Sequence, residues 1–205
     1  MGDTHALAVE VFRAVCGRLA DRAADLGHLV EADAPLDGWL EGEAYLACRS
    51  RSAGCPFGEV TARPTYGSEG VPGKDGRPSG ERGALLVGGV GEPGHHQWVF
   101  AEFVLLFDGD RRTGDWRVRT EAAAARLLRL GWKRSASVLV VAVVGRGDAE
   151  ADWAEHLKSM PTWGRPPLTD PFRLALPGGG SMVVRAFDIK RDPADTLTAT
   201  GPGQA

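Results

Sequence analysis

The sequence of 205 residues lacks asparagine altogether and contains one isoleucine, three cysteines and no long hydrophobic run. An odd number of cysteines, Cys16, Cys48 and Cys55, disfavours a framework of disulfide bonds. The longest apolar stretch, residues 138–144, is far shorter than the roughly 20 residues that a membrane-spanning helix needs. No basic stretch precedes an apolar core near Met1, so no signal peptide is predicted. These absences lead us to expect a cytoplasmic protein with no membrane partner.

An excess of charge of either sign is also missing. The 24 basic and 27 acidic residues leave a formal net charge of −3. Arginine outnumbers lysine 20 to four and there are 28 glycines. This bias indicates a GC-rich coding sequence and makes single arginines and glycine pairs weak evidence for a site. Binding to a polyanion depends on clustered positive charge, so the near balance disfavours a general nucleic-acid binder.

Periodicity in the apolar residues predicts the secondary structure. Spacings of three and four from Thr4 to Leu26 indicate an amphipathic helix that Gly27 ends. Alternation over residues 39–49 is typical of a half-buried strand, and residues 98–107, apolar on both faces, predict a central strand. Further elements are expected as a short strand (83–90), a helix capped by Thr120 (120–130), a buried strand (137–144), a helix capped by Asp148 (148–159) and a hairpin (172–176 with 182–189).

This order predicts an α+β fold with a mixed, mainly antiparallel sheet, one crossover connection and a cover of two or three helices. We expect one globular domain over residues 1–191. Residues 50–97 contain 12 glycines and five prolines, so a flexible Gly/Pro-rich excursion is predicted at about 50–83. Residues 192–205 lack apolar side chains and are expected to form a disordered tail.

Glu102 is the most informative single residue, because the same face of its strand otherwise carries Trp98, Phe100, Val104 and Leu106. A carboxylate in such a position must be protonated, paired or bound to a cation. If the predicted strands at residues 39–49 and 98–107 are neighbours, Glu41 and Glu43 approach Glu102, and such a cluster can hold a divalent ion or divide the roles of acid and base. The alternative, which base rates favour, is an ion pair between Glu102 and one of the arginines.

A second acid cluster comes from the predicted C-terminal hairpin. With a turn near Gly178 and Gly179, Asp170 falls opposite Asp188, and Lys190 shares a strand face with Asp188. This D…DxK set resembles the metal site of the restriction-endonuclease-like nucleases, and the resemblance covers these three residues. It implies two carboxylates that bind Mg²⁺ or Mn²⁺ and a lysine that polarises the attacking water. The family places its second acid ahead of a helix and a further strand, whereas here a polar tail follows.

The densest basic region contains two tryptophans and lies around the second predicted helix. Trp116, Arg117, Arg119 and Trp132 are candidate binding residues there, although a solvated helix face is the favoured alternative. No complete catalytic set is present, and tryptophan is enriched where proteins bind one another. We therefore expect a non-catalytic protein-binding module, an adaptor, chaperone-like or regulatory protein without a cofactor. The alternative is a metal-dependent nuclease or phosphodiesterase with a restriction-endonuclease-like core that acts on nucleic acid through Glu43, Glu102, Asp170, Asp188 and Lys190.

Overall fold

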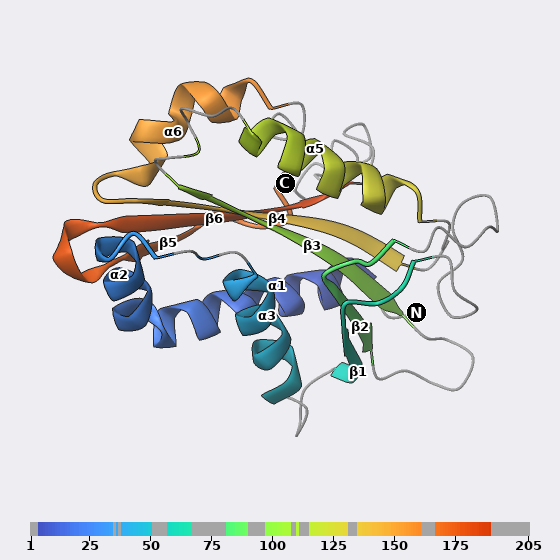
Figure 1. Ribbon diagram of the computed structural model, residues 1–205. Coiled ribbons are helices and arrows are strands. Elements are labelled where there is room, and N and C mark those ends of the chain that lie inside the picture. Colours follow the sequence, from blue (N-terminus) through green and yellow to red (C-terminus); the bar gives the residue numbers. More distant parts are fainter. Residues whose placement is uncertain are drawn as a thin grey trace, which may run out of the picture.

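The fold is a mixed six-stranded sheet with helices on both faces, seen in a computed structural model of the chain (Figure 1). The structure describes residues 4–34, 36, 38–50, 57–66, 81–89, 97–107, 110, 115–130, 135–160 and 167–189. The strands are β1 (Phe57–Ala62), β2 (Leu85–Gly89), β3 (Trp98–Phe107), β4 (Ser135–Gly145), β5 (Phe172–Ala175) and β6 (Ser181–Asp188). The helices are α1 (Thr4–Asp21), α2 (Ala23–Glu31), α3 (Trp39–Ser50), α5 (Asp115–Leu128) and α6 (Ala149–Lys158), with a short 3₁₀ turn at Pro177–Gly179.

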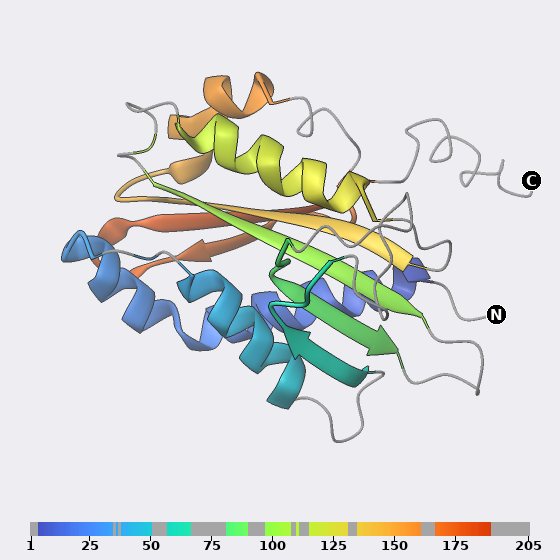
Figure 2. The ribbon, with the colours of Figure 1, turned by 45° about the vertical axis from the view of Figure 1, so that its right-hand side comes forward.

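The strands lie in the order β1-β2-β3-β4-β6-β5. β3 and β4 are parallel and are joined through α5, whereas every other neighbouring pair is antiparallel. The predicted α+β class, with a mixed, mainly antiparallel sheet and one crossover, is confirmed. The helical cover is larger than the two or three helices predicted: α1, α2 and α3 lie on one face, and α5 and α6 lie on the other (Figures 1 and 2).

Two hydrophobic cores lie on the two faces of the sheet, because successive side chains of a strand point to opposite faces. On β3, Val99, Ala101 and Phe103 enter the core beneath α1 and α3. Phe100 and Val104 enter the second core, together with Trp116 of α5 and Trp153 of α6. The prediction that β3 buries apolar side chains on both faces is therefore confirmed. Its two edges differ, because β4 pairs along the whole strand and β2 along only part of it.

The predicted strand at residues 39–49 is wrong, because these residues form helix α3. Its buried residues are Leu40, Glu43, Ala44, Ala47 and Cys48. Their spacings of three, four, seven and eight follow the period of a helix. The alternation that indicated a strand mixes buried and exposed positions: Glu43 on its polar side is buried, and Leu46 on its apolar side is exposed.

Three smaller predictions are also corrected. Gly27 does not end a helix but lies within α2, where an added Cβ would come within 2.9 Å of Pro177 Cδ. Thr120 lies inside α5 and donates to the carbonyl of Trp116 at 2.8 Å, so it is not the helix cap. β1 was missed, because it lies within the Gly/Pro-rich segment predicted as an excursion.

The predicted cap of the later helix is confirmed: Asp148 Oδ1 accepts hydrogen bonds from the amides of Glu150 and Ala151, both at 3.1 Å. The remainder of the predicted excursion, residues 51–56 and 67–80, and the predicted tail, residues 192–205, lie outside the described residues. In the described ranges, no helix is long and apolar enough to cross a membrane.

Candidate functional site

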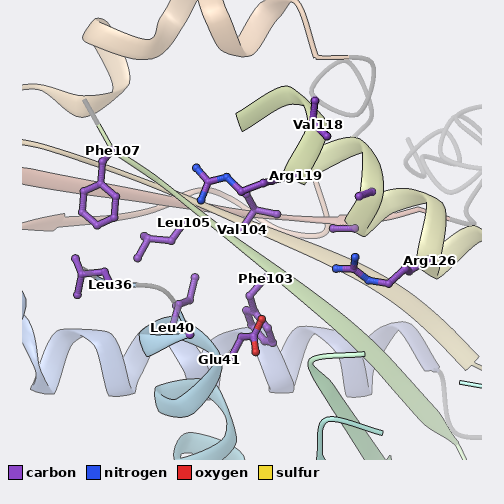
Figure 3. Close-up of a pocket in the computed structure, with 13 residues that line it drawn as sticks. Leu36, Leu40, Glu41, Phe103, Val104, Leu105, Phe107, Val118, Arg119 and Arg126 are labelled. Carbon is purple, nitrogen blue, oxygen red and sulfur yellow. The ribbon is translucent and has the colours of Figure 1, made fainter. Parts of the chain in front are cut away.

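A groove of about 350 Å³ lies beside the C-terminal half of β3, between α5 and the start of α3 (Figure 3). Phe103, Leu105 and Phe107 lie along it on the strand. Its walls come from the two flanking helices and the segment before α3: Leu36, Gly38, Leu40 and Glu41 on one side and Val118, Arg119, Ala122, Ala123 and Arg126 on the other. The groove therefore follows a strand edge that two helices flank.

That edge of the sheet is open because β2 is shorter than β3. β2 pairs with residues 98–101 of β3, from Gly88 opposite Trp98 to Leu85 opposite Ala101. Beyond this point the two segments of the β1–β2 ribbon stay paired with each other, with Ala84 accepting a hydrogen bond from the amide of Arg63 at 3.0 Å, but the pairing of β2 with β3 ends. On the side of β2, no described strand pairs with residues 102–107 of β3.

Successive residues of a strand direct their backbone N–H and C=O groups to opposite edges. This alternation identifies which backbone groups of β3 face the open edge. The amide of Gly89 donates to the carbonyl of Gln97 at 2.8 Å, and every second residue of an antiparallel strand directs its N–H and C=O to the same neighbour. Phe103, Leu105 and Phe107 therefore direct theirs to the open edge. The amide of Phe107 donates to Asp110 Oδ2 at 2.9 Å. The edge-facing groups of Phe103 and Leu105 have no partner within the described part of the chain.

Glu102 supports the groove from beneath α5. It is 2% exposed, accepts a hydrogen bond from Tyr66 Oη at 2.8 Å and forms an ion pair with Arg126 Nη2 at 2.7 Å. Burial and the carboxylate of Glu102 together raise the pKa of Tyr66 well above its ordinary value, so its hydroxyl stays a donor. Of the two alternatives for Glu102, the structure bears out the ion pair with arginine.

Glu41 is the groove's one lining carboxylate within the described residues, and its situation differs from that of Glu102. It is half-buried in the first turn of α3 and has neither a hydrogen bond nor an ion pair within the described chain. Burial, and next the charge of Glu102, raise the pKa of Glu41, while Arg63 and Arg126 lower it. The net direction is upward, so the site penalises the charged form.

The α5 wall combines apolar surface with two arginines that form ion pairs. Val118 is 67% exposed and Ala122 is also exposed. Arg119 forms an ion pair with Asp110 at 2.7 Å, and Arg126 is held by Glu102. Both arginines are therefore neutralised by acids of the chain itself, whereas Glu41 is not.

The predicted approach of Glu43 to Glu102 does not occur, because α3 is a helix. Glu43 is buried on the face toward α1, and its Oε2 pairs with Arg18 Nε at 2.6 Å. Arg22 lies 3.7 Å from its other oxygen. Of the two acids expected near Glu102, Glu41 is the one whose charge interacts with it. Glu43 instead joins α3 to α1 through its ion pair with Arg18.

The predicted pairing of Asp170 with Asp188 is wrong. Phe172 pairs with Val184 and Ala175 with Ser181, and beyond Phe172 it is the amide of Leu168 that donates to the carbonyl of Ala186, at 2.7 Å, so Asp170 does not continue the strand pairing. Lys190 lies outside the described residues. No group of three or more His, Cys, Asp or Glu side chains is placed to hold a metal ion in the part of the chain that is described.

The predicted tryptophan and arginine site is divided between core and surface. Trp116 is 2% exposed and packs edge to face on Trp153, with ring centroids 5.8 Å apart. Arg117 lies 5.1 Å from the centre of the Trp116 ring and donates to Ser159 Oγ at 2.9 Å. Arg119 lines the groove, and Trp132 lies outside the described residues. Trp116 thus contributes to the core instead of contacting a partner.

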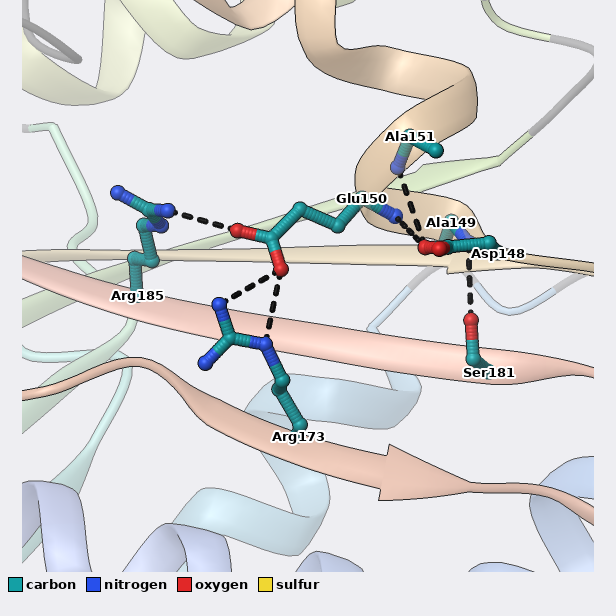
Figure 4. A network of polar contacts seen from close by, with 7 residues as sticks. All are labelled: Asp148, Ala149, Glu150, Ala151, Arg173, Ser181 and Arg185. Carbon is teal, nitrogen blue, oxygen red and sulfur yellow. Dashed lines mark hydrogen bonds and ion pairs between the residues drawn. The ribbon is translucent and has the colours of Figure 1, made fainter.

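A second polar network, shown in Figure 4, joins α6 to the C-terminal hairpin. Glu150 bridges Arg173 and Arg185, at 2.7 and 2.8 Å, and Ser181 Oγ accepts from the amide of Ala149 at 2.9 Å. Burial raises the pKa of Glu150, but its hydrogen bonds to the two arginines outweigh that effect and lower it. Because each of these charges has a partner on the next element, the network holds the helix on the sheet.

Comparisons with known proteins find no relative of this chain. No family model, no curated protein and no solved structure matches the chain. Sequence reasoning missed Phe103 and Leu105 as edge residues and Val118 and Ala122 as wall residues. The exposed Val118 on a helix is the one signal in the sequence that could have indicated this surface.

Proposed function

We propose that this protein is a non-catalytic binding module that captures an extended segment of a partner protein by β-strand addition in the groove beside β3. The observation that carries the proposal is the open edge at Phe103 and Leu105, set between two helices. An extended peptide supplies the amides and carbonyls that such an edge lacks, and main-chain hydrogen bonds of this kind supply much of the affinity in strand addition.

The dimensions favour a short segment as the occupant. Residues 102–107 correspond to a strand of roughly 20 Å, and a volume of about 350 Å³ is at the small end of the range for ligand sites. Native proteins usually protect an edge strand by covering or charging it. Here Asp110 satisfies the amide of Phe107, while Leu105 and Phe103 have no edge partner in the described part of the chain.

Two further properties belong to the same proposal. The partner is a protein, since the groove offers backbone groups in the spacing of a strand. A cytoplasmic location is consistent with the buried thiols of Cys16 and Cys48, because thiols persist in reducing compartments. Burial raises the pKa of Cys16 to about 12, so this thiol is inert.

The test is selection from a displayed library of random peptides of about ten residues on the purified full chain. Ala122→Trp fills the groove, and its matched control is Ala125→Trp, an exposed alanine of α5 outside the groove. We expect binders that the control variant keeps and Ala122→Trp loses by at least about 10-fold in Kd, equivalent to about 1.4 kcal/mol.

The bound peptide must also protect the amides of Phe103 and Leu105 from hydrogen exchange. Peptides that bind both tryptophan variants equally, or leave these two amides unprotected, would overturn the proposal. So would sedimentation that shows a self-associated chain whose association Ala122→Trp abolishes, because the groove would then be occupied by a second copy.

A further inference from the structure

We infer that the captured segment carries a lysine or arginine that pairs with Glu41, two or four positions from an apolar residue that meets Leu36 and Leu40. This inference rests on the proposed function and names the chemistry of its partner. It follows from three features of the groove: an unpartnered acid, neutralised bases and a fixed spacing along the strand.

The unpartnered acid is Glu41. The first turn of a helix favours a carboxylate, yet Glu41 is half-buried and has no hydrogen bond or ion pair from the described residues. Its neighbours are Glu102, which repels its charge, and Arg63 and Arg126, which attract it. A half-buried carboxylate gains most from a partner that brings both a positive charge and a donor.

The neighbouring bases are already engaged or lie outside the groove. Arg126 Nη2 is 2.7 Å from Glu102 Oε2, and Arg119 Nη2 is 2.7 Å from Asp110 Oδ2. Arg63 is exposed at the end of the β1–β2 ribbon and does not line the groove. Among its described lining residues, the groove therefore presents one uncompensated charge, which is negative, and charge complementarity selects a basic side chain.

The spacing comes from the alternation of side chains along an added strand. Side chains of the captured segment that face α3 repeat every second residue. In the view of Figure 3, Glu41 lies toward the Phe103 end of the groove, whereas Leu36 lies toward Leu105 and Phe107. A basic residue at Glu41 therefore lies two or four positions from the apolar residue at Leu36 and Leu40. Side chains of the opposite parity meet Val118 and Ala122, where small apolar residues fit.

The experiment compares selections from the same random peptide library on the wild-type chain and on Glu41→Lys. We expect basic residues to be enriched at one position by the wild type and acidic residues at that position by Glu41→Lys. A selected peptide, and its analogue with methionine at the basic position, are then measured against wild type, Glu41→Gln and Glu121→Gln. Glu121 is an exposed acid of α5 outside the groove.

We expect the wild type and Glu121→Gln to bind the basic peptide about 10-fold more tightly than its analogue, and Glu41→Gln to bind the two within about 2-fold. A basic position whose contribution survives in Glu41→Gln would overturn the inference. Selected peptides that protect Phe103 and Leu105 but show no basic preference would overturn it too, while leaving the proposed function intact. Failure of both chains to select any groove-binding peptide would overturn both.

Discussion

The residue at position 83 must be small, because it lies against the ring of Tyr66, which donates a hydrogen bond to Glu102. A Cβ added to Gly83 would overlap the Tyr66 ring and hydroxyl, and Tyr66 is buried and donates to Glu102. We expect Gly83→Ala to lower the free energy of unfolding by about 1–3 kcal/mol, the usual range for overpacking. Urea unfolding of the full chain measures this change.

Gly42 provides the opposite case for the same substitution. It lies in α3 with nothing within 4 Å of an added Cβ, so Gly42→Ala is expected to stabilise by about 0.5–1 kcal/mol through the lower entropy of the unfolded chain. Equal effects of the two substitutions would contradict the packing of Tyr66 over Gly83.

Glu41 is expected to make stability depend on pH. Its pKa in the folded protein is raised above the ordinary value of 4.5, chiefly by burial and then by Glu102. A group with a raised pKa binds more protons when folded, so its contribution to stability is full below pH 4.5 and is lost as the pH rises through the folded value. Glu41→Gln cannot ionise and should therefore gain stability relative to the wild type as the pH rises from 4 to 7.

Urea unfolding at several pH values checks this dependence, and Glu121→Gln, which removes an exposed acid of α5 outside the groove, is the matched control. A stability difference between Glu41→Gln and the wild type that is the same at every pH would show that the carboxylate is not penalised in the folded groove.

At the scale of single residues, the sequence predicts some interactions and not others. An acid among apolar side chains on a strand must find a partner, which correctly predicted the ion pair of Glu102. It did not predict Tyr66 as the second partner, because that residue follows a long segment with no periodic signal. The helix cap at Asp148 was predictable, since it depends on a local arrangement of three residues.

At the scale of elements, β3 behaves as two half-strands. Its first four residues have β2 on one side and β4 on the other, and its last six have β4 as their one neighbour among the described strands. We expect the amides of Phe103 and Leu105 to exchange hydrogen rapidly in the free protein, while Val104 and Leu106, whose amides are directed to β4, exchange slowly. Hydrogen exchange resolved by NMR measures the four amides separately.

The contrast between adjacent amides is the control built into this measurement, because the four residues are consecutive on one strand and differ in whether the amide faces β4 or the open edge. Slow exchange at both Phe103 and Leu105 in the absence of peptide would mean that the edge is covered in solution. The proposed strand addition would then have no free backbone to pair with.

Elements were predicted correctly where one periodicity dominates and wrongly where two periods overlap. β4, β6 and the hairpin were found because they are apolar or sharply alternating. In α3, Leu40, Ala44 and Ala47 carry the helical period, but the alternation of Trp39, Glu41, Glu43 and Tyr45 resembles a strand. The open edge could not be predicted at all, because a strand that is apolar on both faces looks central along its whole length, and the short reach of β2 is a tertiary property.

For the whole molecule, strand addition would extend the sheet between the two helical layers and link both layers through the peptide. The segment would contact α3 on one side and α5 on the other, so its binding should stabilise the folded chain as a unit. A ligand that binds only the folded state stabilises it by about 2.7 kcal/mol when present at about 100 times its Kd.

This stabilisation corresponds to a rise in Tm of roughly 5 to 10 °C for a chain of this size. We expect such a rise for the wild type and for Ala125→Trp when a library-selected peptide is added, and less than about 1 °C for Ala122→Trp. Differential scanning calorimetry over a series of peptide concentrations separates this linkage from a fixed effect, because the shift must grow with the logarithm of free peptide. A shift of equal size in Ala122→Trp would mean that the peptide stabilises the fold from another surface, since the tryptophan would occupy the space between α3 and α5 that the added strand requires.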